Sequence, residues 1–304
     1  MIRSVTVVNQ LGEMLTMELR NPWRSGFNIT NITGIGAPKG VINSTAVAPG
    51  DGDLFNSARA DKRNIVFSIS FVEVPTIEAA RHLSYKMFPV KQMVTLIFEM
   101  DTRTAIISGW VESNEPDIFS QKEGCQISIL CMDPYFYAIG EYIPQVTDLS
   151  NIEPMFEFPF GNGSLVDRLM IMGDIQVNQE ATVYYLGEAP TGAIFKINAT
   201  GPATNVTLYN TTSGEQMSID TTKLEALTGS AIKLGDEITI NTIRGSKSIS
   251  LLRSGVKTNI LNCINLDSNW FVIRPGDNLF AFTADTGALN LQIQIINQVL
   301  YEGI

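Results

Sequence analysis

The sequence predicts a mainly β protein of two domains, an α+β half with a single helix followed by an all-β half. Three observations predict this fold class. Apolar and polar residues alternate in short strand-like segments along the chain, and only one segment in the first half has helical spacing. In the second half, turn signals return about every 8–12 residues, a spacing typical of a β-sandwich. The 304 residues are enough for two ordinary cores, and we place the domains at 1–141 and 142–304.

The first predicted elements are two short strands, Val5–Val8 and Met14–Leu19. Residues 21–63 follow as a long connection rich in Gly, Asn, Pro and Asp. Connections of this length are unusual in a compact domain and often functional. Beyond it, Ile65, Phe67, Ile69 and Phe71 alternate with smaller or more polar residues, which predicts a half-buried strand.

A helix is predicted over 76–88, with Thr76 as its N-cap and Pro89 as its stop. Its apolar face consists of Ile77, Ala80, Leu83, Ser84 and Met87. Three strands are expected after it, at Met93–Glu99, Thr104–Val111 and Cys125–Cys131, with an acidic loop (Glu112–Glu123) before the last. A lone helix set among antiparallel strands makes the first domain α+β.

The second half is predicted to be an antiparallel β-sandwich. Residues 193–199 and 289–295 alternate most clearly. Gly245-Ser246 suits a tight hairpin with glycine at the first turn position, and Pro275-Gly276 suits a type II turn between strands at Trp270–Arg274 and Leu279–Thr283. Thr222–Thr228 is expected to form a short helical turn that ends at Gly229.

The composition excludes several classes of function. A net charge of −10 and a pI near 4.7 disfavour nucleic-acid binding through phosphate neutralisation, which needs clustered Lys and Arg. The apolar runs are too short to span a bilayer, and with no apolar signal-peptide core at the start we expect folding in a cytoplasm. Cys125 and Cys131 would lie about 20 Å apart along one strand, too far to bridge, so buried thiols are expected.

No catalytic, cofactor or metal site is predicted. The single histidine, His82, is expected on the solvated side of the helix. Asp51 and Asp53 lie among glycines, but their spacing departs from a calcium loop. Pairs among Asp101, Asp117 and Glu123 are no more than an acidic chain provides by chance.

Three tryptophans could each stack on a sugar ring or pack at an interface. Trp110 and Trp270 are placed in strands, where core or interface packing is the better interpretation. Trp23 lies in the long connection and is the one most expected to face a partner.

Taken in order, these segments resemble the distal tail protein family of long-tailed bacteriophages with siphovirus morphology. The resemblance rests on the order and spacing of motifs that are individually unspecific. In the first half they are Ile32–Gly40, Arg63–Phe67, Tyr85–Pro89, Gly109–Glu112 and Cys131–Phe136; in the second half they are Asn162-Gly163, Gly235-Asp236, Arg244–Lys247, Asp267–Trp270 and Arg274–Asn278.

The resemblance implies a structural virion protein without enzymatic activity, assembled in the bacterial host cytoplasm. The first domain would be similar to phage tail-tube subunits and close six copies into a ring, and the second would be a galectin-like sandwich. The ring would join the tail-tube protein to the tail-tip fibre protein at the baseplate. The outer domain would dock receptor-binding proteins or bind host saccharide, and DNA would pass the lumen without specific binding.

Unpaired sheet edges and a long arm are liabilities in a monomer and useful in a ring that closes head to tail. We therefore expect the arm around residues 21–63 and the helix 76–88 to contact a neighbouring subunit. The candidate interface residues are Trp23, Ile35, Pro38, Arg63, Arg81 and Tyr85, and the candidate domain-junction residues are Asp133, Pro134, Tyr135 and Phe136.

Two alternatives belong to other functional classes. A carbohydrate-binding module would contact the host cell wall through a shallow groove with exposed aromatic side chains on the second domain. A tail-associated hydrolase would need a positioned acid/base pair, which the sequence does not indicate.

Overall fold

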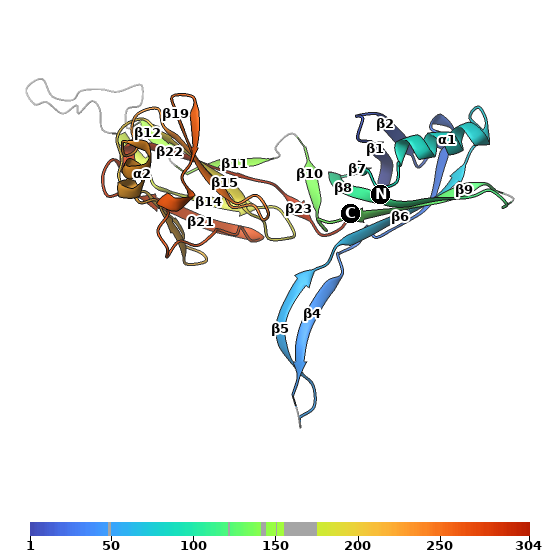
Figure 1. Cartoon of the computed structure of the whole chain (residues 1–304), viewed down its shortest axis with the longest axis horizontal. Helices are drawn as coiled ribbons and strands as arrows, with labels where there is room; N and C mark the ends of the chain where they lie inside the picture. The colour runs from blue at the N-terminus through green and yellow to red at the C-terminus, as the bar shows by residue number, and fades with distance from the viewer. Residues whose placement is uncertain (48–49, 121, 141–143, 150, 155–174) are drawn as a thin grey trace, which may run out of the picture. The chain divides into compact units, whose positions relative to one another are not determined.

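The computed structural model describes residues 1–47, 50–120, 122–140, 144–149, 151–154 and 175–304, and the chain forms two compact units. Unit 1 consists of Met1–Ile143 together with Leu300–Ile304, and unit 2 of Pro144–Val299 (Figure 1). The expected domain boundary at 141/142 and the Asn162-Gly163 motif lie outside the described residues. The expected end of the second domain at residue 304 is wrong, because β23 (Leu300–Tyr301) pairs with β10 (Phe136–Ile139) in unit 1. Unit 2 is thus inserted between two paired strands.

Unit 1 is built on one antiparallel sheet with the strand order β2-β1-β7-β8-β9-β6-β3, to which β10 adds beside β8 and β23 beside β10. Its strands are β1 (Ile2–Val8), β2 (Met14–Glu18), β3 (Phe27–Thr33), β6 (Arg63–Phe71), β7 (Met93–Met100), β8 (Thr104–Asp117) and β9 (Gly124–Cys131). The predicted strands of the first half are confirmed. Part of the expected loop Glu112–Glu123 is instead strand, since β8 continues to Asp117 and pairs with β9 throughout.

The sheet of unit 1 curls so that its two end strands come together. β2 and β3 contact each other, and the short 3-10 helix η1 (Pro22–Arg24) between them contacts both. The concave face encloses a core in which Phe67 stacks on Phe98 at 6.4 Å between ring centroids, and Phe98 meets Phe136 edge-on at 5.8 Å. The predicted alternation along β6 is borne out, because Ile65, Phe67 and Ile69 are all buried.

Helix α1 (Ile77–Met87) confirms the helix prediction in detail. The Thr76 hydroxyl accepts a hydrogen bond from the main-chain amide of Ala79 at 3.1 Å, which satisfies one of the free donors of the first turn. Ala80, Ser84 and Met87 are buried against the sheet, and the helix ends before Pro89.

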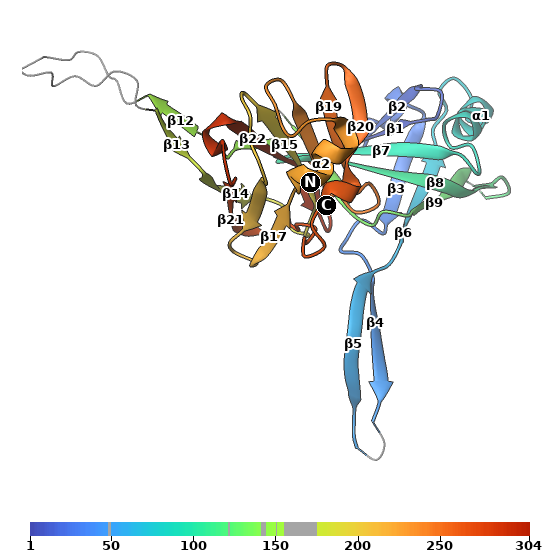
Figure 2. The ribbon, with the colours of Figure 1, turned by 60° about the vertical axis from the view of Figure 1, so that its left-hand side comes forward.

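The long connection 21–63 is more ordered than the sequence suggested. Residues 27–33 form strand β3 of the main sheet. The remainder contains a two-stranded hairpin, β4 (Gly40–Ala46) and β5 (Asp53–Ala60), which projects away from the sheet of unit 1 in both views (Figures 1 and 2). We call residues 39–61 the arm and the segments 34–38 and 62–63 its root. Periodicity missed the hairpin because nearly all of its side chains are exposed, so neither face alternates with a core.

Unit 2 is a β-sandwich. One sheet has the order β11-β22-β15-β18-β19-β20 and the other β14-β21-β16-β17, while β12 (Asn151–Pro154) and β13 (Ile175–Asn178) pair separately. Phe195, Phe271 and Phe280 join the two layers, with centroid separations of 5.3–5.7 Å. The strands of the two sheets are β11 (Gln145–Asp148), β14 (Glu180–Tyr185), β15 (Ala193–Ala199), β16 (Thr207–Asn210), β17 (Glu215–Ser218), β18 (Glu237–Asn241), β19 (Ser248–Arg253), β20 (Val256–Asn259), β21 (Gly276–Thr283) and β22 (Leu291–Asn297).

The local predictions for the second half hold in part. Helix α2 (Thr221–Thr228) ends at Gly229, whose φ of +80° is the left-handed conformation that glycine tolerates. Gly245 also has a positive φ, but it is the third residue of a turn closed by Ser246 N–H to Ile243 O at 3.0 Å, within a six-residue loop rather than a tight hairpin. Trp270–Arg274 is not a strand, because only Ile273 pairs there, as an isolated bridge.

No helix in the described ranges of the chain is long and apolar enough to cross a membrane.

We predict that loss of a phenylalanine strongly destabilises unit 1 when the residue lies in the core and leaves its stability nearly unchanged when the residue lies in the arm. Phe67→Ala should lower the free energy of unfolding of unit 1 by about 3–5 kcal/mol, because it leaves a cavity beside Phe98. Phe55→Ala on the arm, where the ring is 68% exposed, should change it by less than about 0.5 kcal/mol. Urea unfolding of both variants checks this, and similar losses in the two would contradict the described core.

Candidate assembly surfaces

The arm presents an apolar face that its own unit does not cover. The register pairs Ile42 with Ala58 and Ser44 with Phe55, so Ile42, Ala58 and Phe55 lie on one face of the hairpin. Ile42 is 69% exposed and Phe55 68% exposed. An isolated two-stranded hairpin is marginally stable in water, and exposed apolar clusters mark interaction sites. The arm is therefore suited to bury its apolar face against a partner.

The opposite face of the arm holds the register of the two strands. Asn43 donates to the Ser57 hydroxyl at 3.0 Å, and Asn56 donates to the Thr45 hydroxyl at 2.6 Å. These cross-strand hydrogen bonds leave Leu54 as the large apolar side chain on this second face, where it is 62% exposed.

Arg63 holds the root of the arm. Its guanidinium donates to the carbonyl oxygens of Gly34 at 2.7 Å, of Pro134 at 2.7 Å and of Glu302 at 2.6 Å, and also to that of Gly36. The same group lies over the Phe136 ring, 4.6 Å from its centroid. Burial lowers the pKa of Arg63 from its ordinary value, while main-chain carbonyls replace the water that the cation has lost.

Gly34 makes the close approach at this root possible. Its φ is +80°, and a Cβ placed on it would lie 1.9 Å from the carbonyl oxygen of Asn64. Any other residue would push the first turn of the root away from β6. The glycine-rich segment of the sequence is thus a packing requirement for the arm's exit from the sheet.

The convex face of the unit 1 sheet has a one-signed charge distribution. The core-facing residues of β6, β7, β8 and β9 alternate with outward residues that include Ser, Thr and Asn, apolar side chains such as Ile97, Ile106 and Trp110, and the acidic residues Glu99, Glu112, Glu115 and Asp117. Arg63 is the only Lys or Arg in these four strands, and it points into the unit. In these four strands the outward face offers carboxylates, hydroxyls and some apolar side chains, but no cation, to a polyanion.

Of the six residues predicted at a subunit interface, Trp23 and Tyr85 are exposed. Trp23 lies in η1 with 65% of its surface accessible, and Tyr85 lies on α1 beside His82. Arg81, also on α1, is half-buried and pairs with Glu123 at 3.5 Å. Ile35 and Pro38 are half-buried in the arm root. Whether these residues touch a neighbour stays a prediction.

The structure corrects the predicted role of Arg63 at a subunit interface. It is only 4% exposed, and its donors are engaged within unit 1, so its side chain has no surface to offer a neighbouring subunit. Its importance is internal, as the residue that joins the arm root to segments distant in sequence.

The four candidate domain-junction residues all lie in unit 1. Phe136 is fully buried in its core, and Pro134 supplies a carbonyl to Arg63. Asp133 is exposed and accepts hydrogen bonds from the Tyr135 amide at 3.2 Å and the Tyr137 hydroxyl at 2.5 Å. Tyr135 is half-buried. The aromatic cluster therefore completes the first core before the chain leaves for unit 2.

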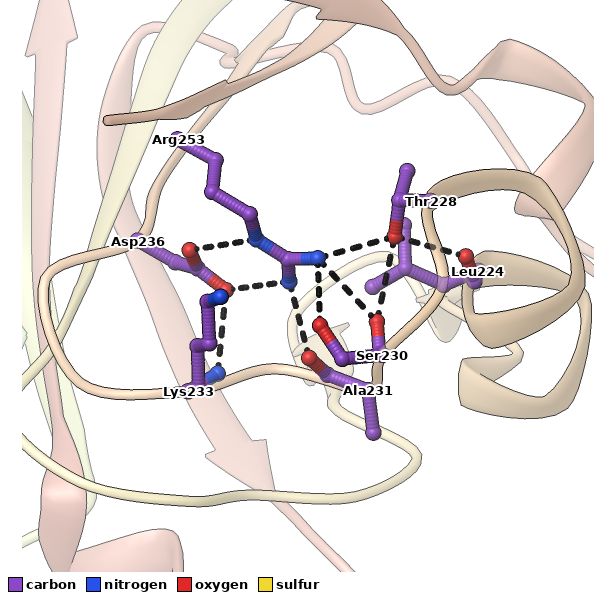
Figure 3. Close-up of polar contacts among 7 residues, drawn as sticks. All are labelled: Leu224, Thr228, Ser230, Ala231, Lys233, Asp236 and Arg253. Atoms are coloured by element: carbon purple, nitrogen blue, oxygen red, sulfur yellow. Dashed lines mark hydrogen bonds and ion pairs between the residues drawn. The ribbon is translucent and has the colours of Figure 1, made fainter. Parts of the chain in front are cut away.

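Unit 2 contains a buried ion pair that the sequence analysis missed (Figure 3). Arg253 on β19 forms a bidentate ion pair with Asp236, in which Nε donates to Oδ1 at 2.8 Å and Nη2 donates to Oδ2 at 2.6 Å. Its remaining donors reach Thr228, Ser230 and Ala231 at the end of α2 and in the following loop. All five donors are used, so this cluster fastens a loop to a strand and has no capacity left for a ligand.

The environment of Asp236 keeps it ionised. Burial by itself raises the pKa of this carboxyl, but the hydrogen bonds from Arg253 and from the Lys233 amide outweigh it and hold the pKa below the ordinary 3.8. The Gly235-Asp236 motif of the sequence is thereby explained as the anchor point for Arg253, a partner 17 residues away.

The described part of the chain shows few features of a catalytic or metal-binding site. Burial raises the pKa of Cys125 to about 12 and that of Cys131 to about 11, so both thiols stay protonated and poorly nucleophilic. Among the described residues, no group of three or more His, Cys, Asp or Glu side chains is placed to hold a metal ion. His82 is exposed beside Glu78, as predicted.

Comparison with known proteins identifies the second unit. Residues 186–294, all within unit 2, match the family model described as "Siphovirus-type tail component, C-terminal domain". This part of the chain is therefore similar to the C-terminal domain of siphovirus-type tail components. The resemblance to the distal tail proteins is thereby confirmed, and the mainly β fold class with it.

Solved structures extend the likeness in fold across the whole chain. The crystal structure of SPP1 Dit, titled a paradigm of the hub adsorption apparatus in phages infecting Gram-positive bacteria, aligns with a TM-score of 0.63 at 11% identity, covering 97% of this chain and 98% of that one. Two structures of the phage P2 baseplate in its activated conformation, with Ca and with Sr, align at TM-scores of 0.47 and 0.43 and identities of 11% and 9%, covering 100% and 97% of both chains. No curated protein matches by sequence. The shared fold with SPP1 Dit therefore spans both units.

We predict that the Asp236–Arg253 pair makes unit 2 sensitive to acid. Because the folded pKa of Asp236 is depressed, its stabilisation is complete above about pH 4 and is lost as the pH falls through the folded value. Asp236→Asn should lower the free energy of unfolding by about 3–5 kcal/mol at pH 7, since it leaves a buried arginine without its counter-charge. This difference from the unsubstituted chain should shrink at pH 3.

Urea titrations at both pH values, followed by Trp270 fluorescence in a Trp23→Phe, Trp110→Phe background, measure this effect. Asp277→Asn, which changes an exposed carboxylate of the same unit, is the control and should cost less than about 0.5 kcal/mol. Equal losses for Asp236→Asn at pH 7 and pH 3 would contradict the assignment.

Proposed function

We propose that this protein is a structural hub of a siphophage tail tip, in which unit 1 closes several copies into a ring. The family resemblance implies six copies, with the ring joining the tail-tube protein to the tail-tip fibre protein. The single observation that carries the assembly role is the arm, a hairpin with an exposed apolar face on a rigidly held root. The protein has a scaffolding role and needs no catalytic group.

The arm fits a head-to-tail contact between copies. A cyclic interface joins two different surfaces of the same chain, so a projecting element on one copy must meet a receiving surface on the next. Burying the Phe55 and Ile42 side chains against a neighbour would contribute about 1.5–3 kcal/mol each. A few such contacts, repeated around a closed ring, are enough for stable association.

The convex face of the unit 1 sheet is suited to line the channel. Three glutamates and no cation occupy the outward positions of its four central strands. Phosphate backbones bind proteins through Lys and Arg, so DNA would slide past such a face without being retained. This assignment supports passage of DNA through the lumen without specific binding.

Unit 2 is proposed to carry receptor-binding components. The alternative, a carbohydrate-binding module, calls for exposed aromatic side chains over a shallow groove. In the described part of unit 2, Tyr184 is the only large aromatic residue that is mostly exposed, and Trp270 is half-buried beside Lys247. A docking platform for protein partners is therefore the better-supported role of this unit.

Removal of the arm should abolish assembly. Replacing residues 39–61 with an Asn-Gly turn shortens the hairpin and leaves the root and both cores intact. We expect the full chain to form rings and the shortened chain to remain monomeric in mass photometry at micromolar concentration. Hydrogen exchange of β6 and β9 confirms that unit 1 is still folded. Rings formed by the shortened chain would refute the role of the arm.

The two faces of the arm should differ in their tolerance of charge. Phe55→Glu places a carboxylate on the face that carries Ile42, and we expect the concentration needed for assembly to rise by at least about tenfold. Leu54→Glu, a matched change at a similarly exposed position on the opposite face, should leave assembly nearly unchanged. If Leu54→Glu is the more damaging of the two, the docking face has been assigned to the wrong side.

A further inference from the structure

We infer that residues Glu302–Ile304, which follow the inserted unit, are the positioning segment of the arm. This rests on the proposed role of the arm in assembly and adds a control on it. The segment contacts the root of the arm through its main chain, so the arm's direction depends on a piece of chain some 240 residues away from it in sequence.

The contacts on the root come from three consecutive residues. Arg63 Nη2 donates to the Glu302 carbonyl at 2.6 Å, and the Ile304 amide donates to the Ile35 carbonyl at 3.0 Å. Between them, Gly303 lies flat against the root. A Cβ added to Gly303 would come within 3.1 Å of the Gly36 carbonyl carbon and 3.2 Å of the Ile35 carbonyl oxygen.

The segment is itself held firmly to unit 1. Phe136 pairs with Tyr301 and Tyr137 with Leu300, which extends the main sheet by β23. Arg103 donates to the Gly303 carbonyl at 2.9 Å, and its guanidinium lies over the Tyr301 ring at 4.3 Å. Ile304 packs against the core of unit 1. The segment therefore links the arm root to a rigid sheet rather than to a mobile end.

Arg63 forms hydrogen bonds with all three segments that meet at the root of the arm. One guanidinium bonds the root at Gly34, the end of the β9 segment at Pro134, and the returning segment at Glu302. Without Glu302–Ile304, one of its donors and one side of the root lose their partners. A hairpin that is only marginally stable by itself would then swing about its root.

The insertion of unit 2 gives this arrangement a consequence for assembly. The chain must pass through all of Pro144–Val299 before Glu302 exists to meet Arg63. The arm consequently acquires its fixed direction only in a chain whose second unit has been made. A copy lacking unit 2 would be a poor competitor for a place in the ring.

The test compares a chain that ends at Tyr301 with the full chain. The shortened chain keeps the β10–β23 pairing and loses the main-chain contacts on the root, together with the Arg103–Gly303 hydrogen bond and the core packing of Ile304. Asp277→Asn is the control, since it removes an exposed carboxylate of unit 2 and leaves residues 302–304 and the root unchanged. Hydrogen exchange of residues 34–63 reports the root and the arm, exchange of β6 and β9 reports the unit 1 core, and mass photometry reports assembly.

We expect amide exchange at the root and along the arm to accelerate by about tenfold or more in the shortened chain, with the β6 and β9 amides unchanged and rings lost. The Asp277→Asn chain should match the unsubstituted protein. Unchanged exchange at residues 34–63 in the shortened chain would overturn the positioning role. Accelerated exchange with rings still formed would support the positioning role and instead refute the proposed part of the arm in assembly.

Should the chain ending at Tyr301 lose its core protection as well, Gly303→Val provides the second variant. It retains all residues and only forces the segment away from the Ile35–Gly36 main chain. The same acceleration at the root is expected with the core intact, and its absence would overturn the inference.

Discussion

The guanidinium of Arg63 is the interaction on which the rest of unit 1 depends. A buried cation must replace its lost hydration, and here main-chain carbonyls from separate segments do so while the Phe136 ring covers one face. The same bonds that satisfy the charge determine where the arm leaves the sheet and where the chain ends its return from unit 2. Because this one buried side chain must be hydrogen-bonded, it brings together three segments that are distant in sequence.

The two units show different ways of using arginine. Arg253 in unit 2 meets a carboxylate, Asp236, and together they tie a loop to a strand inside a closed sandwich. Arg63 meets main-chain oxygens of separate segments and ties those segments together. The first arrangement stabilises a finished domain, whereas the second holds a projecting element ready for a partner. The proposed hub needs both, a firm platform and a directed arm.

Sequence reasoning succeeded where side chains alternate against a core. The β6 pattern, the Thr76-capped helix and the strand at 193–199 followed from periodicity and capping alone. The strand predicted at 289–295 was placed two residues early, because Leu289 lies in a 3-10 helix and β22 begins at Leu291. The arm hairpin was missed because its exposed faces impose no alternation, and Arg63 was assigned to a surface because no local pattern marks a buried cation. The return of Leu300–Ile304 to unit 1 depends on a pairing with β10 across the whole insertion, which no local signal records.

Assembly of identical copies through the arm is the central claim, and electron microscopy of the purified full-length protein tests it most directly. We expect closed rings with six-fold symmetry, alone or stacked, in which the hairpin of each copy lies on the next one around the circle. Solitary particles at high concentration, or rings in which the hairpins project into solvent and touch no neighbour, would contradict it.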